Sequence, residues 1–235
     1  EKVEWTNFAY KECSEADASH IGLNGEPLRK TSKWSSGDSG LHFHDMKAYQ
    51  KFLIEKYGTN DEPSTTHKEL FFDIETEMGD ALTVEYIQSA PKKVTSIAWY
   101  DKQVDEWGIL ILDKKSQLNR TKARNKEIIP CATEDELLMK FLEKFREIDP
   151  DIITGHNIFG YDLDYLNYIM ESEGLGLQLG RDKSYAKFGK KPRRYRVDGA
   201  QTWDFKNCKI FGRHVIDGMF LAVKYDIGRQ YESWG

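Results

Sequence analysis

Alternation of apolar and polar residues predicts several short strands beyond residue 67. In LFFDIET, inside the segment 68–76, every second side chain is apolar, which is typical of a strand with one buried face. Segments 94–101 and 106–113 are rich in apolar residues and are joined by a short polar turn, so we expect an antiparallel pair. Further short strands are expected at 151–154, 196–203 and 214–217.

A spacing of three to four residues between apolar positions predicts helices between these strands. Thr133 and Glu136 form a capping box, and Pro150 ends the pattern that follows. The apolar stripe of this helix consists of Leu137, Leu138, Phe141, Leu142, Phe145 and Ile148. Other helices are expected over 161–172 and around 218–226. Alternating strands and helices predict an α/β domain with a mixed sheet.

The first 66 residues have a different character. Residues 1–45 are mostly polar, and only a few aromatic and apolar residues near the start hint at a strand (Val3, Trp5, Phe8 and Tyr10). A helix is expected over 46–57 with Asp45 as its N-cap. The following GTNDEPSTTHK has the composition of a linker. We therefore expect a smaller N-terminal domain over 1–66 and the α/β domain over 67–235.

Composition narrows the function classes. Charged residues make up 31% of the 235, and no apolar run of about 18 residues occurs, so no membrane span is expected. The 34 Lys and Arg against 39 Asp and Glu give no overall positive field for nucleic acid. Three scattered cysteines predict neither disulfides nor a cysteine zinc site, and they favour the cytoplasm. A start at Glu1 without a signal segment, and an end at Gly235 without a polar tail, indicate a fragment of a longer protein.

Two carboxylates share one face of the predicted strand 68–76. Asp73 and Glu75 lie about 7 Å apart along a strand, opposite the apolar side chains. Like charges on a central strand repel each other and lose solvation, and a divalent cation removes both costs. Oxygen ligands suit Mg²⁺ or Mn²⁺. The same pattern also fits a solvated edge strand whose carboxylates point to water.

A second candidate segment is GHNIFGYDLDYL, residues 155–166. It follows a short apolar strand and opens a helix, with Asp162 in the first helical turn. An aspartate there can simply stabilise the helix N-terminus. It can also be a third carboxylate that faces Asp73 and Glu75, because sites in α/β sheets gather at the ends of central strands.

Together these segments resemble the first and second exonuclease motifs of family B DNA polymerases. FDIET matches the first motif, and HN-x-x-GYD-x-x-YL matches the second. PDIITGHNIFGYDLDYL and GRHVIDGMFLAVKYD also resemble the family, and the likeness covers about residues 46–235, with both phage and archaeal types fitting. It implies a 3′–5′ proofreading exonuclease of the DEDD class with an RNase H-like fold. It also implies a primer 3′ end and the palm, fingers and thumb of a polymerase as partners.

The resemblance assigns roles to individual residues. Asp73 and Glu75 would hold two divalent cations, Mg²⁺ or Mn²⁺, and Asp162 would be a ligand or supporting carboxylate of this site. Asn157 and Tyr161 would lie near the terminal nucleotides. Phe71, beside the first motif, is either a neighbour of a terminal base or a core residue.

One motif of the family is not found. The third exonuclease motif is Tyr-x-x-x-Asp, but Tyr225 is followed by Arg229 and Tyr231 by Gly235. Asp217, in HVID, is not a metal ligand in the family. Three of four carboxylates are thus identified. An alternative is a non-catalytic piece of a split polymerase that binds single-stranded DNA or a partner chain, and a further one is another RNase H-like nuclease, such as a ribonuclease or junction resolvase.

A basic stretch, RDKSYAKFGKKPRRYR, covers residues 181–196. It holds eight Lys and Arg with three aromatic residues between them, a composition suited to single-stranded nucleic acid. A solvated loop, expected within an inserted ribbon over 174–195, has the same composition. The candidate DNA-binding residues are Lys190, Lys191, Arg193 and Arg194.

Overall fold

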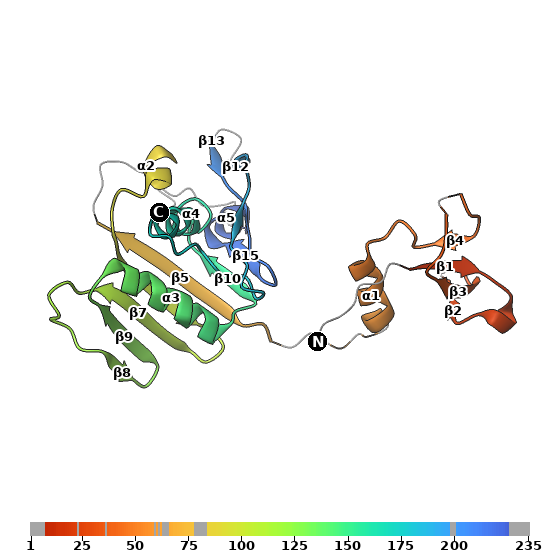
Figure 1. Ribbon diagram of the computed structural model, residues 1–235, viewed down its shortest axis with the longest axis horizontal. Coiled ribbons are helices and arrows are strands. Elements are labelled where there is room, and N and C mark those ends of the chain that lie inside the picture. The colour runs from red at the N-terminus through yellow and green to blue at the C-terminus, as the bar shows by residue number, and fades with distance from the viewer. Residues whose placement is uncertain are drawn as a thin grey trace. The chain divides into compact units, whose positions relative to one another are not determined.

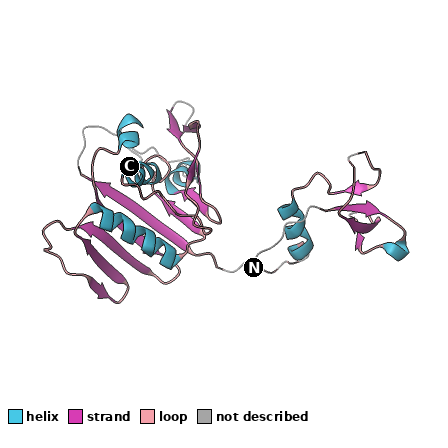
Figure 2. Ribbon diagram, viewed as in Figure 1, coloured by secondary structure: helices cyan, strands magenta, loops and turns pink. Residues whose placement is uncertain are grey.

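The computed structural model divides the chain into two compact units, Glu1–Thr65 and Thr66–Gly235 (Figures 1 and 2). The structure describes residues 8–22, 24–35, 37–58, 60, 62, 66–77, 84–197 and 201–225.

The first unit contains a small antiparallel sheet in the order β2-β3-β1-β4 and one helix. Its elements are β1 (Ala9–Glu12), a 3-10 helix (Glu15–Asp17), β2 (His20–Ile21), β3 (Pro27–Thr31), β4 (Leu41–His42) and α1 (Ala48–Tyr57). The buried core is formed by Phe8, Tyr10 and Leu28. Most of its strands are too short to give a periodic signal, so the sequence revealed only the first.

The start of α1 differs from the expectation. Asp45 is not its N-cap, because the helix begins at Ala48 and the N–H of Lys47 donates to the side-chain oxygen of Gln50, at 3.1 Å. The predicted strand signal at Val3 and Trp5 lies outside the described residues.

The second unit is built on a seven-stranded sheet in the order β15-β10-β5-β6-β7-β9-β8. Its strands are β5 (Glu69–Thr76), β6 (Val94–Asp101), β7 (Glu106–Leu112), β8 (Thr121–Ala123), β9 (Lys126–Cys131), β10 (Ile152–Gly155) and β15 (His214–Asp217). β6 and β7 are antiparallel, as predicted, whereas β10 is parallel to both β5 and β15. The mixed α/β class is therefore confirmed, and β8 and β9 are strands that the sequence did not reveal.

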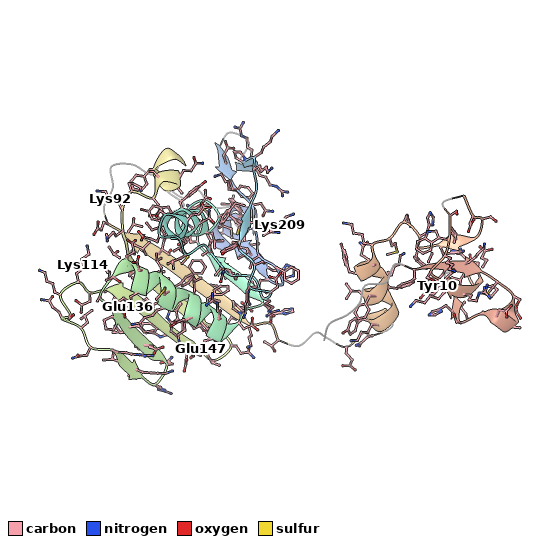
Figure 3. All side chains as sticks on the ribbon, viewed as in Figure 1. Tyr10, Lys92, Lys114, Glu136, Glu147 and Lys209 are labelled. Carbon is pink, nitrogen blue, oxygen red and sulfur yellow. The ribbon has the colours of Figure 1, made fainter. Side chains whose placement is uncertain are left out.

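One helix, α3 (Glu134–Ile148), packs along one face of this sheet. Figure 3 labels Glu136 in its first turn and Glu147 in its last turn. All six residues of the predicted apolar stripe are buried, and the ring of Phe141 lies 5.3 Å from that of Phe72 on β5. Each such side chain contributes about 1.5–3 kcal/mol through burial. The hydroxyl of Thr133 accepts the Glu136 N–H, which confirms the predicted cap.

The remaining helices are α2 (Val84–Ser89), α4 (Asp162–Ser172) and α5 (Gly218–Tyr225). None of the helices among the described residues is long and apolar enough to cross a bilayer.

The predicted strand over 196–203 is wrong. Two strands, β12 (Arg193–Val197) and β13 (Gln201–Phe205), pair antiparallel as a hairpin, with Val197 opposite Gln201. The chain reverses inside the range that we had taken as one strand. A second small pair, β11 (Lys187–Phe188) with β14 (Cys208–Lys209), lies next to it in sequence. The inserted ribbon therefore extends beyond residue 195.

Candidate functional site

The two strand carboxylates lie on the face of β5 that α3 does not cover. The side chains of Asp73 and Glu75 are exposed, whereas Leu70, Phe72 and Ile74 between and before them are buried. Their partners on β6, Ala98 and Ser96, are small and leave space above the sheet. Partial burial raises the pKa of Asp73, and the nearby imidazole of His156 lowers it. A ligand can therefore reach both carboxylates.

Asp162 is brought to the same strand by the turn before α4. Its side chain is buried, and its Oδ1 accepts the Ile74 N–H at 2.9 Å. Ile74 lies between Asp73 and Glu75. β10 pairs with β5 only as far as Phe71. Beyond Phe71 the Ile74 N–H has no partner on β10, and the Asp162 carboxylate accepts it instead. The end of β10 thus creates the position that Asp162 occupies.

The charge state of Asp162 is strongly perturbed. Burial is the main cause and raises its pKa to about 8. The Ile74 N–H works against this shift, whereas the charges of Asp73 and Asp217 add to it. A nearby cation would favour the ionised form, since opposite charge stabilises a buried carboxylate.

Asp217 is a functional candidate that sequence reasoning did not promote. Its Oδ1 accepts the N–H groups of Asn157 and Met219, at 3.1 and 3.0 Å, and its Oδ2 accepts that of Phe159, at 3.1 Å. The side chain is buried at the end of β15, next to β10. Asp217 therefore fixes the turn that leads to Asp162. The available signal was an aspartate at the end of an apolar strand, HVID.

The turn itself is tight. Asn157 has a left-handed backbone with φ 55°, and a Cβ at Gly160 would lie 2.3 Å from the Asn157 side-chain oxygen. A side chain at position 160 would force this turn to open. Asn157 is half-buried, and its side-chain oxygen lies against Gly160.

Tyr161 is joined to the same strand as the carboxylates. Its hydroxyl lies 2.8 Å from the hydroxyl of Thr76, at the end of β5, and burial raises its pKa. Thr76 was not among the predicted site residues. This bond fixes the ring of Tyr161 beside Glu75, one residue before Thr76.

The basic stretch divides into structural and exposed residues. Arg181 forms ion pairs with Asp149 and Asp151, at 3.1 and 2.6 Å, and so fastens the turn between α3 and β10. Arg194 pairs with Asp204 across the hairpin, at 2.9 Å. Lys190, Lys191 and Arg193 are exposed and form no ion pair with any residue that the structure describes. Within that same part of the chain, no hydrogen bond or ion pair joins these cations to the three carboxylates.

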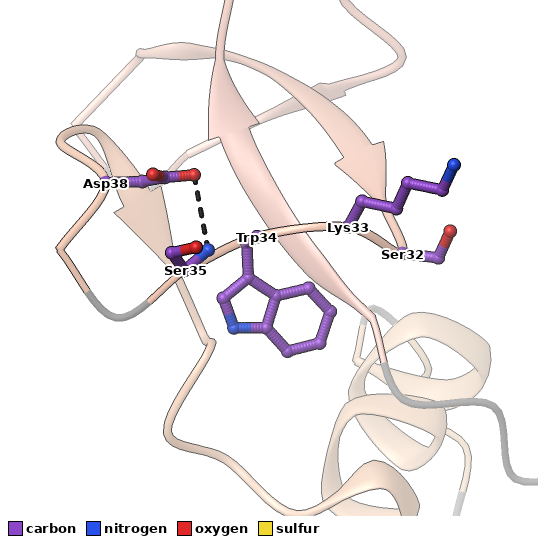
Figure 4. Close-up of a pocket in the computed structure, with 5 residues that line it drawn as sticks. All are labelled: Ser32, Lys33, Trp34, Ser35 and Asp38. Atoms are coloured by element: carbon purple, nitrogen blue, oxygen red, sulfur yellow. Dashed lines mark hydrogen bonds between the residues drawn. The ribbon is translucent and has the colours of Figure 1, made fainter.

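Metal-ligand geometry is incomplete. Within the described ranges, no three His, Cys, Asp or Glu side chains are grouped closely enough to hold an ion. The first unit has a depression of about 580 Å³ lined by Ser32, Lys33, Trp34, Ser35 and Asp38 (Figure 4). It offers a single carboxylate, whose oxygen accepts the Ser35 N–H at 3.4 Å. The carboxylates of the second unit are therefore the better candidates for a metal.

Two exposed carboxylates on β5 and a buried third one at the start of α4, bonded to the same strand, make up the candidate site. The chain belongs to the family B DNA polymerases, because the family model for their exonuclease domain matches residues 44–229.

Individual relatives agree with this assignment. The chain is 29% identical to a DNA polymerase of Pyrococcus glycovorans over 191 residues, which is 81% of this chain and 22% of that protein. It is 56% identical to the DNA polymerase delta catalytic subunit of Caenorhabditis elegans over 103 residues, 41% of this chain and 9% of the relative. A DNA polymerase of Pyramimonas orientalis virus is 45% identical over 40 residues, 17% of this chain and 3% of the viral protein. The chain thus spans less than a quarter of the length of these relatives.

Proposed function

We propose that this chain carries the 3′–5′ exonuclease site of a family B DNA polymerase. The site would hydrolyse the terminal phosphodiester at a single-stranded 3′ end and release a nucleoside monophosphate. The observation that carries this proposal is the bond from the Ile74 N–H to Asp162, which sets a third carboxylate beside Asp73 and Glu75.

The donor set fits divalent cations of the Mg²⁺ or Mn²⁺ type. All three groups offer carboxylate oxygens, which these ions prefer. Asp73 and Glu75 would hold a pair of such ions, with Asp162 as ligand or support, and the ions would supply an activated water and neutralise charge at the leaving 3′ oxygen. The raised pKa of Asp162 supports this assignment, because a cation is what keeps a buried carboxylate ionised.

Other residues would bind and orient the DNA strand. Tyr161 directly precedes Asp162 and is held by its bond to Thr76, and Asn157 is held through its backbone N–H by Asp217; both would contact the terminal nucleotides. Phe71 is 38% exposed and would pack against a base. The exposed cations of the ribbon would contact phosphates upstream (Lys190, Lys191, Arg193 and, once released from Asp204, Arg194).

The finer architecture is also part of the proposal. β5 in the middle of the sheet, antiparallel to β6 and parallel to β10, supports an RNase H-like fold for residues 67–235. Residues 1–66 would be part of the N-terminal domain of the polymerase. The division of the chain after Thr65 supports this boundary.

A second candidate function is a non-catalytic segment that binds single-stranded DNA or the rest of a polymerase. One observation favours it. The described side chains do not assemble a three-ligand metal group. Addition of a polypeptide that supplies the third motif would then restore hydrolysis.

Digestion of a single-stranded DNA oligonucleotide tests the first proposal. We expect stepwise loss of 3′ nucleotides with Mg²⁺ or Mn²⁺, reduced more than about a hundredfold by Asp73→Ala, since even groups around metal ligands typically contribute 10–100-fold. Glu69→Ala is the matched control. Glu69 is on the same strand but is paired with Lys102, at 2.8 Å, and an ion pair of this kind contributes little.

The outcomes separate the candidates. Digestion that survives Asp73→Ala contradicts the assignment of Asp73. Binding without digestion in the wild-type chain favours the non-catalytic segment. Cleavage at internal sites rather than from the 3′ end would instead indicate another RNase H-like nuclease.

A further inference from the structure

Three aromatic side chains form a row across the face of the sheet that α3 leaves uncovered. Phe71 on β5 is directly opposite Tyr100 on β6, and Tyr100 is directly opposite Trp107 on β7. The rings of Phe71 and Tyr100 are 5.9 Å apart. Phe71 and Trp107 lie on β5 and β7, on either side of β6, and remain 38% and 42% exposed, so the row is an exposed apolar patch of the kind that marks binding sites.

The row is held in a defined geometry. The hydroxyl of Tyr100 donates to the Asp105 carboxylate, at 3.1 Å, and this bond orients its ring. Lys126 on β9 is the cross-strand neighbour of Trp107, and its ammonium lies 4.8 Å from the Trp107 ring centroid. The row of three rings therefore ends beside the Lys126 ammonium. Single-stranded nucleic acid binds such surfaces because its bases stack on the rings and its phosphates are attracted to the cation.

The row is continuous with the candidate site. A groove of about 380 Å³ is lined by all three rings together with Asp73 and His156. Phe71 precedes Asp73 by two residues, about 7 Å along the strand, and each further strand adds about 4.8 Å. A strand whose terminal phosphate is at Asp73 would thus place its next nucleotides over the rings.

The size of the row argues against a protein partner as its main occupant. An aromatic side chain buries at most about 150–250 Å², and these three are already more than half covered. The area that remains is well below the roughly 1,200–2,000 Å² of a stable protein interface. Stacked bases, in contrast, need only the ring faces.

We propose that the row Phe71–Tyr100–Trp107, with Lys126 at its end, binds the unpaired bases that precede the 3′ terminus of a DNA strand. This inference rests on the proposed exonuclease function for the direction of the strand. The row binds without reading sequence, because every base presents an aromatic face.

The test is the affinity of the 235-residue chain for labelled thymidine homopolymers, measured by fluorescence anisotropy with EDTA so that no strand is cut. Trp107→Ala should weaken binding about tenfold, within the range that one stacked base contributes. Trp107→Phe should restore most of the loss. Met139→Ala, at a 48% exposed position on α3, is the matched control and should bind like the wild type.

A strand with abasic sites instead of bases separates stacking from phosphate contacts. On that strand Trp107→Ala and the wild type should bind equally, because only the backbone is left. Equal affinity for thymidine strands overturns the proposal, as does an equal loss on the abasic strand. Phe71→Ala gives an independent second measurement at the other end of the row.

Failure of this inference can be distinguished from failure of the proposed function. If the row does not bind bases, digestion that depends on Asp73 is still expected. If digestion is absent while Trp107→Ala still weakens base-dependent binding, the row belongs to a non-catalytic DNA-binding segment. Normal circular dichroism spectra of the variants confirm that the fold is intact.

Discussion

The carboxylates of the second unit form two groups that differ in their partners. Asp73 and Glu75 on β5 are exposed, and no described residue donates a hydrogen bond to their carboxylate oxygens. Asp162 and Asp217 are buried and together accept four backbone N–H groups. The first pair is open to a ligand, whereas the second pair holds the protein itself in place.

This difference shows how the site is built. The buried pair positions the turn 155–161 and the start of α4 against β5. All of its hydrogen bonds come from backbone N–H groups, so they do not depend on the side chains of the donor residues. The exposed pair depends on a rigid strand for its placement, and the described residues form no ion pair with it at salt-bridge distance, although His156 lies near Asp73. Asp162 links the two groups, because its buried carboxylate accepts the Ile74 N–H of β5 and the charge of Asp73 raises its pKa.

Replacement of Asp162 is expected to have the largest effect on activity and stability. Asp162→Asn keeps an oxygen for the Ile74 N–H but removes the charge, so activity should fall more than about a hundredfold while stability is retained. Asp162→Ala should lose the same activity and also about 1–3 kcal/mol of unfolding free energy, because a buried N–H loses its acceptor. Digestion rates and urea unfolding check both. Equal stability of the two variants would show that the bond to Ile74 is unimportant.

Replacement of Asp217 tests the purely structural member of the pair. Asp217→Ala leaves the N–H groups of Asn157, Phe159 and Met219 without their acceptor, and we expect a loss of about 2–4 kcal/mol in urea unfolding. Asp217→Asn retains one acceptor oxygen and should lose less. If the alanine variant is as stable as the wild type, water or another group fixes the turn.

A third test concerns the pH dependence of stability. The pKa of Asp162 is about 8 in the fold and 3.8 without it, so between these values the folded state holds a proton that the unfolded state has lost. With EDTA, stability should therefore fall as pH rises from about 5 to about 8, by at most about 1.4 kcal/mol per pH unit. Asp162→Asn should flatten the profile in urea unfolding. A wild-type profile that rises over this range contradicts the shift.

Much of the second unit could be predicted from its sequence. The alternation in β5 and the stripe of α3 are strong periodic signals over eight and fifteen residues, and both elements occur where they were expected. β8 and most strands of the first unit have two to five residues, too few for a period to appear. The strand predicted over 196–203 failed because it ignored Asp198-Gly199, a dipeptide typical of tight hairpin turns.

The candidate site was predictable in its residues but not in its contacts. Sequence reasoning selected Asp73, Glu75 and Asp162, and their roles in catalysis remain a proposal. It did not identify Thr76, and it named Asp217 only to set it aside as a metal ligand, because hydrogen bonds to a hydroxyl or to backbone amides leave no pattern in sequence. Arg181, part of the basic stretch, has a structural role through Asp149 and Asp151, which lie 32 and 30 positions away.

The sequence by itself determined the family and the faces of the individual elements, since motif spacing and periodicity are local properties of the chain. Only the tertiary structure decided which groups meet. β10 ends opposite Phe71 and so leaves the Ile74 N–H to Asp162, and three aromatic residues from separate strands align beside Asp73. Both depend on strand register, which is set by packing between segments far apart in the chain.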